Sequence, residues 1–173
     1  MIEKSPPNMC RYRALVAMLD GMRTYVAVMT RDPFATCASW YRRYPRTKIE
    51  RDWGWPDGRP PDDEDAYFRA LAQIWIGRAK YLRGASNEAI CRLRYEDFAD
   101  DPATTIQLLA KAIPRLGNAD ATATVRVKDY PPAPIHNTNE ATLKILTDRQ
   151  RQQIASVLVQ HSELVTEFGY PVM

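Results

Sequence analysis

Two residues are placed where they can hold an anion together. Arg31 follows the apolar run 24–29 after one threonine, and Ser39 lies eight residues further on, beyond an Asp-Pro pair that favours a helix start. A guanidinium there can fork onto a phosphate, and the free amides at the helix N-terminus add partial positive charge. A hydroxyl two helical turns up the same face can donate to the same anion. The spacing predicts a phosphate site formed by Arg31 and Ser39.

The same residues also have a purely structural interpretation. Arg31 would then pair with Asp32 or Asp97, and Ser39 would face solvent. The spacing alone favours neither interpretation, so both stay open at this point.

The elements that position these residues alternate between strands and helices. Residues 24–29 and 89–93 are short apolar runs, typical of strands buried on both faces of a parallel sheet. Apolar periodicity and capping residues predict helices over 8–21, 33–44, 63–84, from Asp101 onward, and over 147–169. This alternation predicts an α/β fold with a parallel sheet flanked by helices.

Two predicted strands are few for an independently stable sheet, which normally needs three or more. We therefore expect that part of the sheet is missing or supplied by another chain, and that the protein self-associates as a homo-oligomer or is unstable. Residues 118–140 are predicted to be irregular, and residues 46–62 to form a long loop. Trp53, Trp55 and Tyr67 either form an acceptor-binding wall or pack that loop onto the body.

Composition indicates one globular domain over residues 1–173. The net charge is +3 and 45% of residues are hydrophobic. The charges are dispersed, which argues against nucleic acid as a partner. No apolar run approaches the roughly 20 residues of a membrane span, and no secretory signal is visible. Three widely spaced cysteines support neither disulfides nor a metal site, so we expect a cytoplasmic protein.

The seven glycines form neither G-x-x-x-x-G-K-[ST] nor G-x-G-x-x-G. The chain therefore contains no phosphate loop of its own, which disfavours a relative of the P-loop kinases.

The segment 30–41 resembles the 3′-phosphate-binding segment of sulfotransferases that use 3′-phosphoadenosine 5′-phosphosulfate (PAPS). Arg31 and Ser39 match that pattern residue by residue. Residues 93–98 resemble the family's Arg-Tyr-Glu-Asp-Leu stretch, and residues 146–170 its closing helix with Phe-Gly-Tyr. The resemblance implies a three-layer, P-loop-NTPase-like sheet, with Arg31 and Ser39 binding the 3′-phosphate of PAPS and no metal required.

The N-terminus resembles the Glu-Lys-[Ser/Thr]-Pro element of the glycan and tyrosine sulfotransferases. Carried to this sequence, the general base is Glu3, which would take the proton of an acceptor hydroxyl as its oxygen attacks sulfur. The alternative is that Glu3 is a frayed terminal residue without a partner. The acceptor implied is a small molecule or a glycan, with a hydroxyl or an amine.

The sequence departs from this family in two places. It lacks the first strand, the phosphosulfate-binding loop and the lysine that stabilises the leaving group. We therefore expect an N-terminally truncated form of the fold that is a poor catalyst or none; an upstream extension, a completing subunit and a remnant are the three explanations. It also lacks the Arg-Lys-Gly motif of the cytosolic branch, a role that falls to the loop 135–139 or to Lys144.

Residues 95–97 are predicted to end the second strand and to tie Arg31 or a neighbouring helix in place. The sequence thus predicts a sulfotransferase domain. The alternative is a non-catalytic nucleotide-binding or subunit-interaction protein derived from the same fold.

Overall fold

The computed structural model describes residues 11–44, 55, 59–85, 89–126 and 131–172. Along the chain, these residues form α1 (Tyr12–Met18), β1 (Ala27–Thr30), α2 (Pro33–Arg43), α3 (Glu64–Ala85), β2 (Cys91–Arg94), α4 (Tyr95–Asp100), α5 (Pro102–Ala110), the 3₁₀-helix η4 (Pro114–Asn118), α6 (Asn139–Leu143), α7 (Asp148–Val159) and α8 (Ser162–Glu167).

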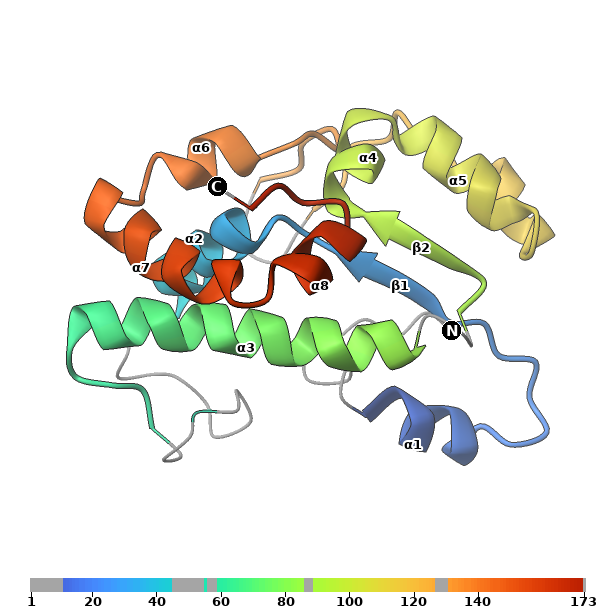
Figure 1. The fold of residues 1–173 in the computed structure, drawn as a ribbon. Helices are drawn as coiled ribbons and strands as arrows, with labels where there is room; N and C mark the ends of the chain where they lie inside the picture. The colour runs from blue at the N-terminus through green and yellow to red at the C-terminus, as the bar shows by residue number, and fades with distance from the viewer. Residues whose placement is uncertain (1–10, 45–54, 56–58, 86–88, 127–130, 173) are drawn as a thin grey trace.

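The two strands pair in parallel, with Ala27 opposite Cys91 and Thr30 opposite Arg94. The connection between them carries α2 and α3, the kind of crossover that parallel strands require. Both strands therefore end at the same edge of the sheet (Figure 1), and Arg31 directly follows the last residue of β1. Within the described residues the protein is mixed α/β, mostly helical, with one two-stranded parallel sheet.

One face of β1 is open, which corrects the expectation that the first strand is buried on both faces. Val28 and Thr30 are buried, whereas Ala27 is exposed and Met29 is 42% exposed. The uniformly apolar run suggested burial on both faces because strands between two helical layers carry such runs. Among the described elements, however, the main apolar cluster includes Val28 and lies on that side of β1, and the other side buries Leu93 of β2 but leaves Met29 open.

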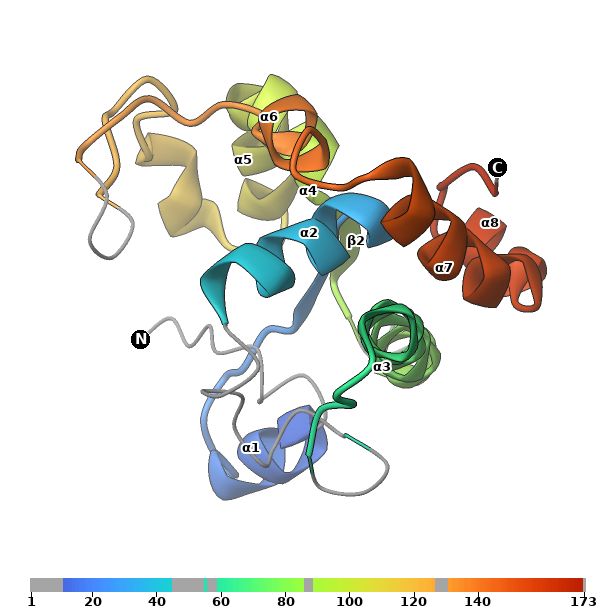
Figure 2. The same cartoon turned by 90° about the vertical axis from the view of Figure 1, so that its left-hand side faces the viewer.

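The long helix α3 is the centre of the core. Figure 1 shows it spanning the molecule alongside β1, and it contacts α2, α7 and α8 as well (Figures 1 and 2). Asp63 caps its start by accepting the Ala66 amide at 2.6 Å, as the sequence predicted for Asp62 or Asp63. Tyr67, Phe68 and Leu71 on its inner face have no exposed surface.

Helix α2 begins and ends close to the predicted positions. Pro33 occupies the first turn, and the Asp32 carboxylate accepts the Ala35 amide at 2.8 Å. The buried face includes Phe34 and Cys37, so the helix rests on the core immediately after the sheet edge. This packing fixes the direction in which the chain leaves Arg31.

The predicted closing helix is two helices. Thr147 and Gln150 form the expected capping box at the start of α7, but the chain turns at His161 and α8 begins at Ser162. Gly169 follows α8 with φ +80°, a left-handed conformation that glycine adopts without strain. The turn at His161 lets both helices place apolar side chains against α3.

Two short α-helices were not predicted. Residues 95–100 form α4, although residues 95–97 were expected to end the strand, and α6 begins at Asn139, at the end of the segment expected to be irregular. Neither is long enough to show a clear apolar period. None of the described helices combines the length and the apolar character needed to cross a bilayer.

The core assignment predicts a contrast between two leucines. Leu71→Ala removes a fully buried side chain and is expected to lower the free energy of unfolding by about 2–5 kcal/mol. Leu108→Ala, at a position 42% exposed on α5, is expected to change it by about 0.5 kcal/mol or less. Urea unfolding of both variants measures the difference, and equal losses would contradict the assignment.

Candidate functional site

Arg31 is held at the carboxyl edge of the sheet by three side chains from the segment around α6. Its Nε donates to Asn139 Oδ1 at 2.8 Å, and Nη2 donates to Thr138 Oγ1 at 3.2 Å and Thr142 Oγ1 at 3.4 Å. All three partners are neutral. They lie 107 to 111 residues away in the sequence, so the tertiary fold alone brings them to Arg31.

An aromatic ring supports the same guanidinium. The Arg31 Cζ lies 4.5 Å from the ring centroid of Tyr95, the first residue of α4. The Tyr95 hydroxyl is 3.0 Å from Thr138 Oγ1 and accepts the Thr138 amide at 3.2 Å. Arg31 therefore stacks on the ring of Tyr95, and the hydroxyl of that ring is held by Thr138, which also binds Arg31.

Arg31 forms no ion pair within the described ranges, so neither pairing proposed by the structural interpretation occurs. Asp97 lies 3.9 Å from Arg94 instead, and Asp32 caps α2. The Nη1 nitrogen of Arg31 has no hydrogen-bond partner among the described residues. The positive charge of Arg31 is thus oriented by neutral groups without a directly bound carboxylate.

Glu96 connects the segments that surround Arg31. Its Oε1 accepts the Asp32 amide at 2.9 Å and Asn139 Nδ2 at 2.7 Å. Its Oε2 accepts the Tyr170 hydroxyl at 3.0 Å and lies 3.8 Å from Arg94 Nε. Four separate parts of the chain therefore meet at one carboxylate, whose side chain is only 12% exposed.

The backbone of Arg31 is also fixed. Its carbonyl oxygen accepts Trp75 Nε1 from α3 at 3.1 Å and lies 3.4 Å from the Thr36 hydroxyl, which donates to it. Side chain and main chain are therefore held by different elements, which limits the orientations open to the guanidinium.

Burial changes the ionisation of the groups at this edge. It lowers the pKa of Arg31, while electrostatic interactions with Tyr95, Glu96 and Asp32 act in the opposite direction. Arg31 stays protonated at neutral pH, because guanidinium groups do not lose their proton in proteins. Burial also raises the pKa of Asp32, although its bonds from the Ala35 and Phe34 amides oppose the rise.

The amides at the start of α2 are not free, contrary to expectation. The Asp32 carboxylate accepts the Ala35 amide, and the Phe34 amide also stabilises its charged form. An aspartate at the N-cap takes up these donors because they lack partners within the helix. The positive character of the site therefore comes from Arg31 rather than from the helix start.

Ser39 lies on the less buried side of α2, three residues beyond Thr36. No hydrogen bond joins it to Arg31 or to the Arg31 partners in the described part of the chain. The structure thus keeps Ser39 on the helix that follows Arg31, and its contact with a shared anion stays a prediction. Glu3 lies outside the described residues, as does Trp53.

Trp55 and Tyr67 pack the interior. Their rings stack with centroids 5.6 Å apart, and they are 4% and 0% exposed. The packing alternative is confirmed for this pair, because rings with so little exposed surface cannot form a wall open to an acceptor.

The loop 135–139 reaches Arg31, one of the two places suggested for the missing Arg-Lys-Gly motif. The other, Lys144, forms an exposed ion pair with Glu140 at 2.8 Å. Sequence reasoning missed Thr142 and the role of Asn139 as a direct partner of Arg31. Their only local signal is the run of Asn and Thr residues that follows the prolines at 131–134.

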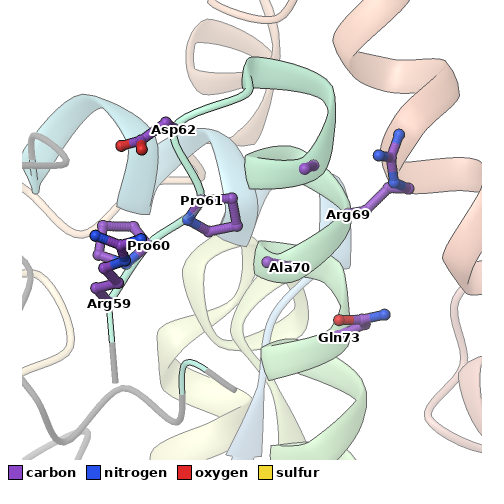
Figure 3. Close-up of a pocket in the computed structure, with 8 residues that line it drawn as sticks. Arg59, Pro60, Pro61, Asp62, Arg69, Ala70 and Gln73 are labelled. Atoms are coloured by element: carbon purple, nitrogen blue, oxygen red, sulfur yellow. The ribbon is translucent and has the colours of Figure 1, made fainter. Parts of the chain in front are cut away.

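A separate cleft of about 320 Å³ lies between residues 59–62 and the first half of α3. Figure 3 shows Arg59 and Asp62 on one side of this cleft, whereas Arg69 and Gln73 point away from them. Arg69 donates to Gln153 on α7 instead. The charged groups around the cleft do not converge on one point, so it is not the anion site.

Among the described residues, no group of His, Cys, Asp and Glu side chains is arranged to hold a metal ion.

No protein-family model, no curated protein and no solved structure matches the chain. The Arg31 site therefore rests on its own geometry.

The burial of Asp32 leads to a prediction about pH. Asp32→Ala removes the cap and is expected to cost about 1 kcal/mol, whereas Asp32→Asn keeps a capping oxygen. Because the folded state raises the Asp32 pKa above 3.8, the contribution of Asp32 to wild-type stability falls as pH rises above that value, and Asp32→Asn does not have this loss. The free energy of unfolding of Asp32→Asn, relative to wild type, is thus expected to increase with pH.

Urea unfolding of the three proteins from about pH 3 to about pH 7 measures this difference. A relative stability of Asp32→Asn that falls over the same interval would show that the attraction of Arg31 and the helix amides for the carboxylate outweighs its burial.

Proposed function

We propose that this chain is a sulfotransferase-type domain whose Arg31 site binds the 3′-phosphate of PAPS. The observation that carries the proposal is a guanidinium at the carboxyl edge of a parallel sheet, oriented by neutral side chains and bound to no carboxylate among the described residues. Ligands of open α/β sheets bind beyond the carboxyl ends of the strands. A phosphate can therefore reach Arg31 at the position where this class of fold binds its ligands.

The chemistry proposed is transfer of a sulfuryl group from PAPS to a hydroxyl or amine of a small molecule or glycan. The acceptor oxygen or nitrogen forms a bond to sulfur while the bond between sulfur and the phosphate oxygen breaks. Adenosine 3′,5′-bisphosphate leaves, and the acceptor proton passes to a base, for which the sequence resemblance offers Glu3. The finer fold proposed is the three-layer, P-loop-NTPase-like sheet, of which β1 and β2 are two strands.

Binding and catalysis are separate parts of this proposal. Arg31 and Ser39 account for the 3′-phosphate alone, and the sequence contains no glycine-rich loop for the 5′-phosphosulfate. Removing one preorganised donor to a developing charge typically costs about 3 kcal/mol. We therefore propose nucleotide binding by this chain, with weak or no transfer unless a phosphosulfate-binding element is added.

A second candidate function is subunit interaction through the open part of the sheet. Met29 on β1 is 42% exposed and Ala27 is exposed on the same face of that strand, which leaves an apolar edge of β1 open. Light scattering distinguishes this function: a concentration-dependent homo-oligomer favours it, and a monomer at all concentrations contradicts it.

Titration calorimetry with adenosine 3′,5′-bisphosphate tests the nucleotide site. Arg31→Ala is expected to weaken binding by about tenfold or more, because it removes a charge-assisted contact to phosphate. The matched control is Arg83→Ala, which removes an exposed arginine paired with Glu167 and is expected to leave the affinity unchanged.

Adenosine 5′-phosphate provides the ligand control, since it lacks the 3′-phosphate. It is expected to bind more weakly than the bisphosphate and with equal affinity to wild type and Arg31→Ala. Absence of bisphosphate binding by the folded wild type would contradict the proposal and favour the interaction function. Measured transfer from PAPS, with and without an added phosphosulfate-binding element, tests catalysis separately.

A further inference from the structure

The side-chain amide of Asn139 binds a donor through its oxygen and an acceptor through its nitrogen. Its Oδ1 accepts Arg31 Nε at 2.8 Å, and its Nδ2 donates to Glu96 Oε1 at 2.7 Å. A guanidinium can only donate, and a carboxylate can only accept. Of the two orientations of the amide, only the observed one satisfies both neighbours, because the reverse places NH₂ against Arg31 and oxygen against Glu96.

Glu96 itself is fixed independently of Asn139. The Asp32 amide shares Oε1, and Oε2 binds the Tyr170 hydroxyl with Arg94 nearby. Burial raises the pKa of Tyr170, so its hydroxyl keeps the proton that it donates to Glu96. The carboxylate that orients Asn139 is thus held from three sides.

The choice of an amide at position 139 matters for charge. A carboxylate in the same place would bind Arg31 Nε directly and neutralise the guanidinium. The amide provides the same acceptor geometry without a charge. Asn139 also lies between the two charged side chains, so Glu96 forms no direct hydrogen bond to Arg31. With Nε and Nη2 engaged by neutral acceptors, the Nη1 end of the guanidinium is the part without a partner in the described chain.

We propose that Asn139, locked in one orientation by Glu96, is a positioning residue that aims the Arg31 guanidinium at its anion without neutralising it. For its ligand, this inference rests on the proposed nucleotide site. It adds that the identity of residue 139 decides whether Arg31 is available to an anion.

The decisive variant is Asn139→Asp. At neutral pH, we expect it to weaken the binding of adenosine 3′,5′-bisphosphate by about tenfold or more, because a carboxylate now pairs with Arg31. The charged groups facing this position are Arg31, Asp32, Arg94 and Glu96. The new carboxylate lies against Glu96, which keeps the Asp32 amide and the Tyr170 hydroxyl as donors, so the new carboxyl group is the one that takes up a proton as the pH falls.

The protonated pair reproduces the wild-type arrangement, with a donor toward Glu96 and a carbonyl oxygen toward Arg31. The ratio of wild-type to variant affinity is therefore expected to shrink from about pH 8 to about pH 5. Comparing the two proteins at each pH cancels the titration of the nucleotide phosphates. A residue with a merely structural role would give a ratio independent of pH.

Two further variants control for charge and folding. Asn118→Asp adds the same charge at an exposed position on η4, where residue 118 bonds neither Arg31 nor its partners, and it is expected to change affinity by about threefold or less. Asn139→Ala removes the acceptor without adding charge, and it is expected to weaken binding without recovery at acid pH. Thermal melts identify any variant that fails to fold.

An NMR measurement without nucleotide separates this inference from the proposed function. The Arg31 Nε–Hε signal, assigned by its loss in Arg31→Lys, is expected to move downfield in Asn139→Asp and to broaden in Asn139→Ala. If it responds in this way but the wild type binds no bisphosphate, the proposed function fails and the positioning role stands. If the signal is unchanged in both folded variants, the positioning role is overturned.

Discussion

The arrangement around Arg31 depends on the carboxylate of Glu96. A charged group with so little exposed surface is stable only when its lost hydration is replaced by hydrogen bonds and opposite charge. The Asp32 amide, Asn139, Tyr170 and Arg94 supply that replacement. Since each comes from a different part of the chain, satisfying this one group brings the start of α2, the start of α6 and the C-terminal segment to the edge of the sheet.

Competition for carboxylates leaves Arg31 without a direct negative partner in the described structure. Asp32 is adjacent in sequence, but its oxygen is taken by the amide donors at the start of α2. Asp97 is close to Arg94, which also lies near Glu96. Helix capping thus occupies Asp32, and Arg94 pairs with Asp97, so neither carboxylate neutralises Arg31. Arg31 therefore lacks a directly bound carboxylate because the nearby carboxylates are used by backbone amides and by another arginine.

Local signals in the sequence predicted the elements that flank the site. Pro33 after Asp32 and the capping box at Thr147 are short-range patterns, and the structure confirms the helix starts that they indicate. The partners of Arg31 were not predictable in this way, because they lie more than 100 residues away and begin a five-residue helix. The open face of β1 was missed because an apolar run does not show which of its faces is covered.

The nature of the acceptors around Arg31 argues for a ligand rather than for a purely structural role. An arginine that only tied α6 to the sheet edge would be held most strongly by a carboxylate. Here, two threonines and an asparagine hold it, and the nearest carboxylate of the network acts through that asparagine. Such a set fixes direction and keeps charge, which are the two properties that an anion site needs from a guanidinium. The geometry therefore favours binding at Arg31, even though Ser39 makes no hydrogen bond to it in the described part of the chain.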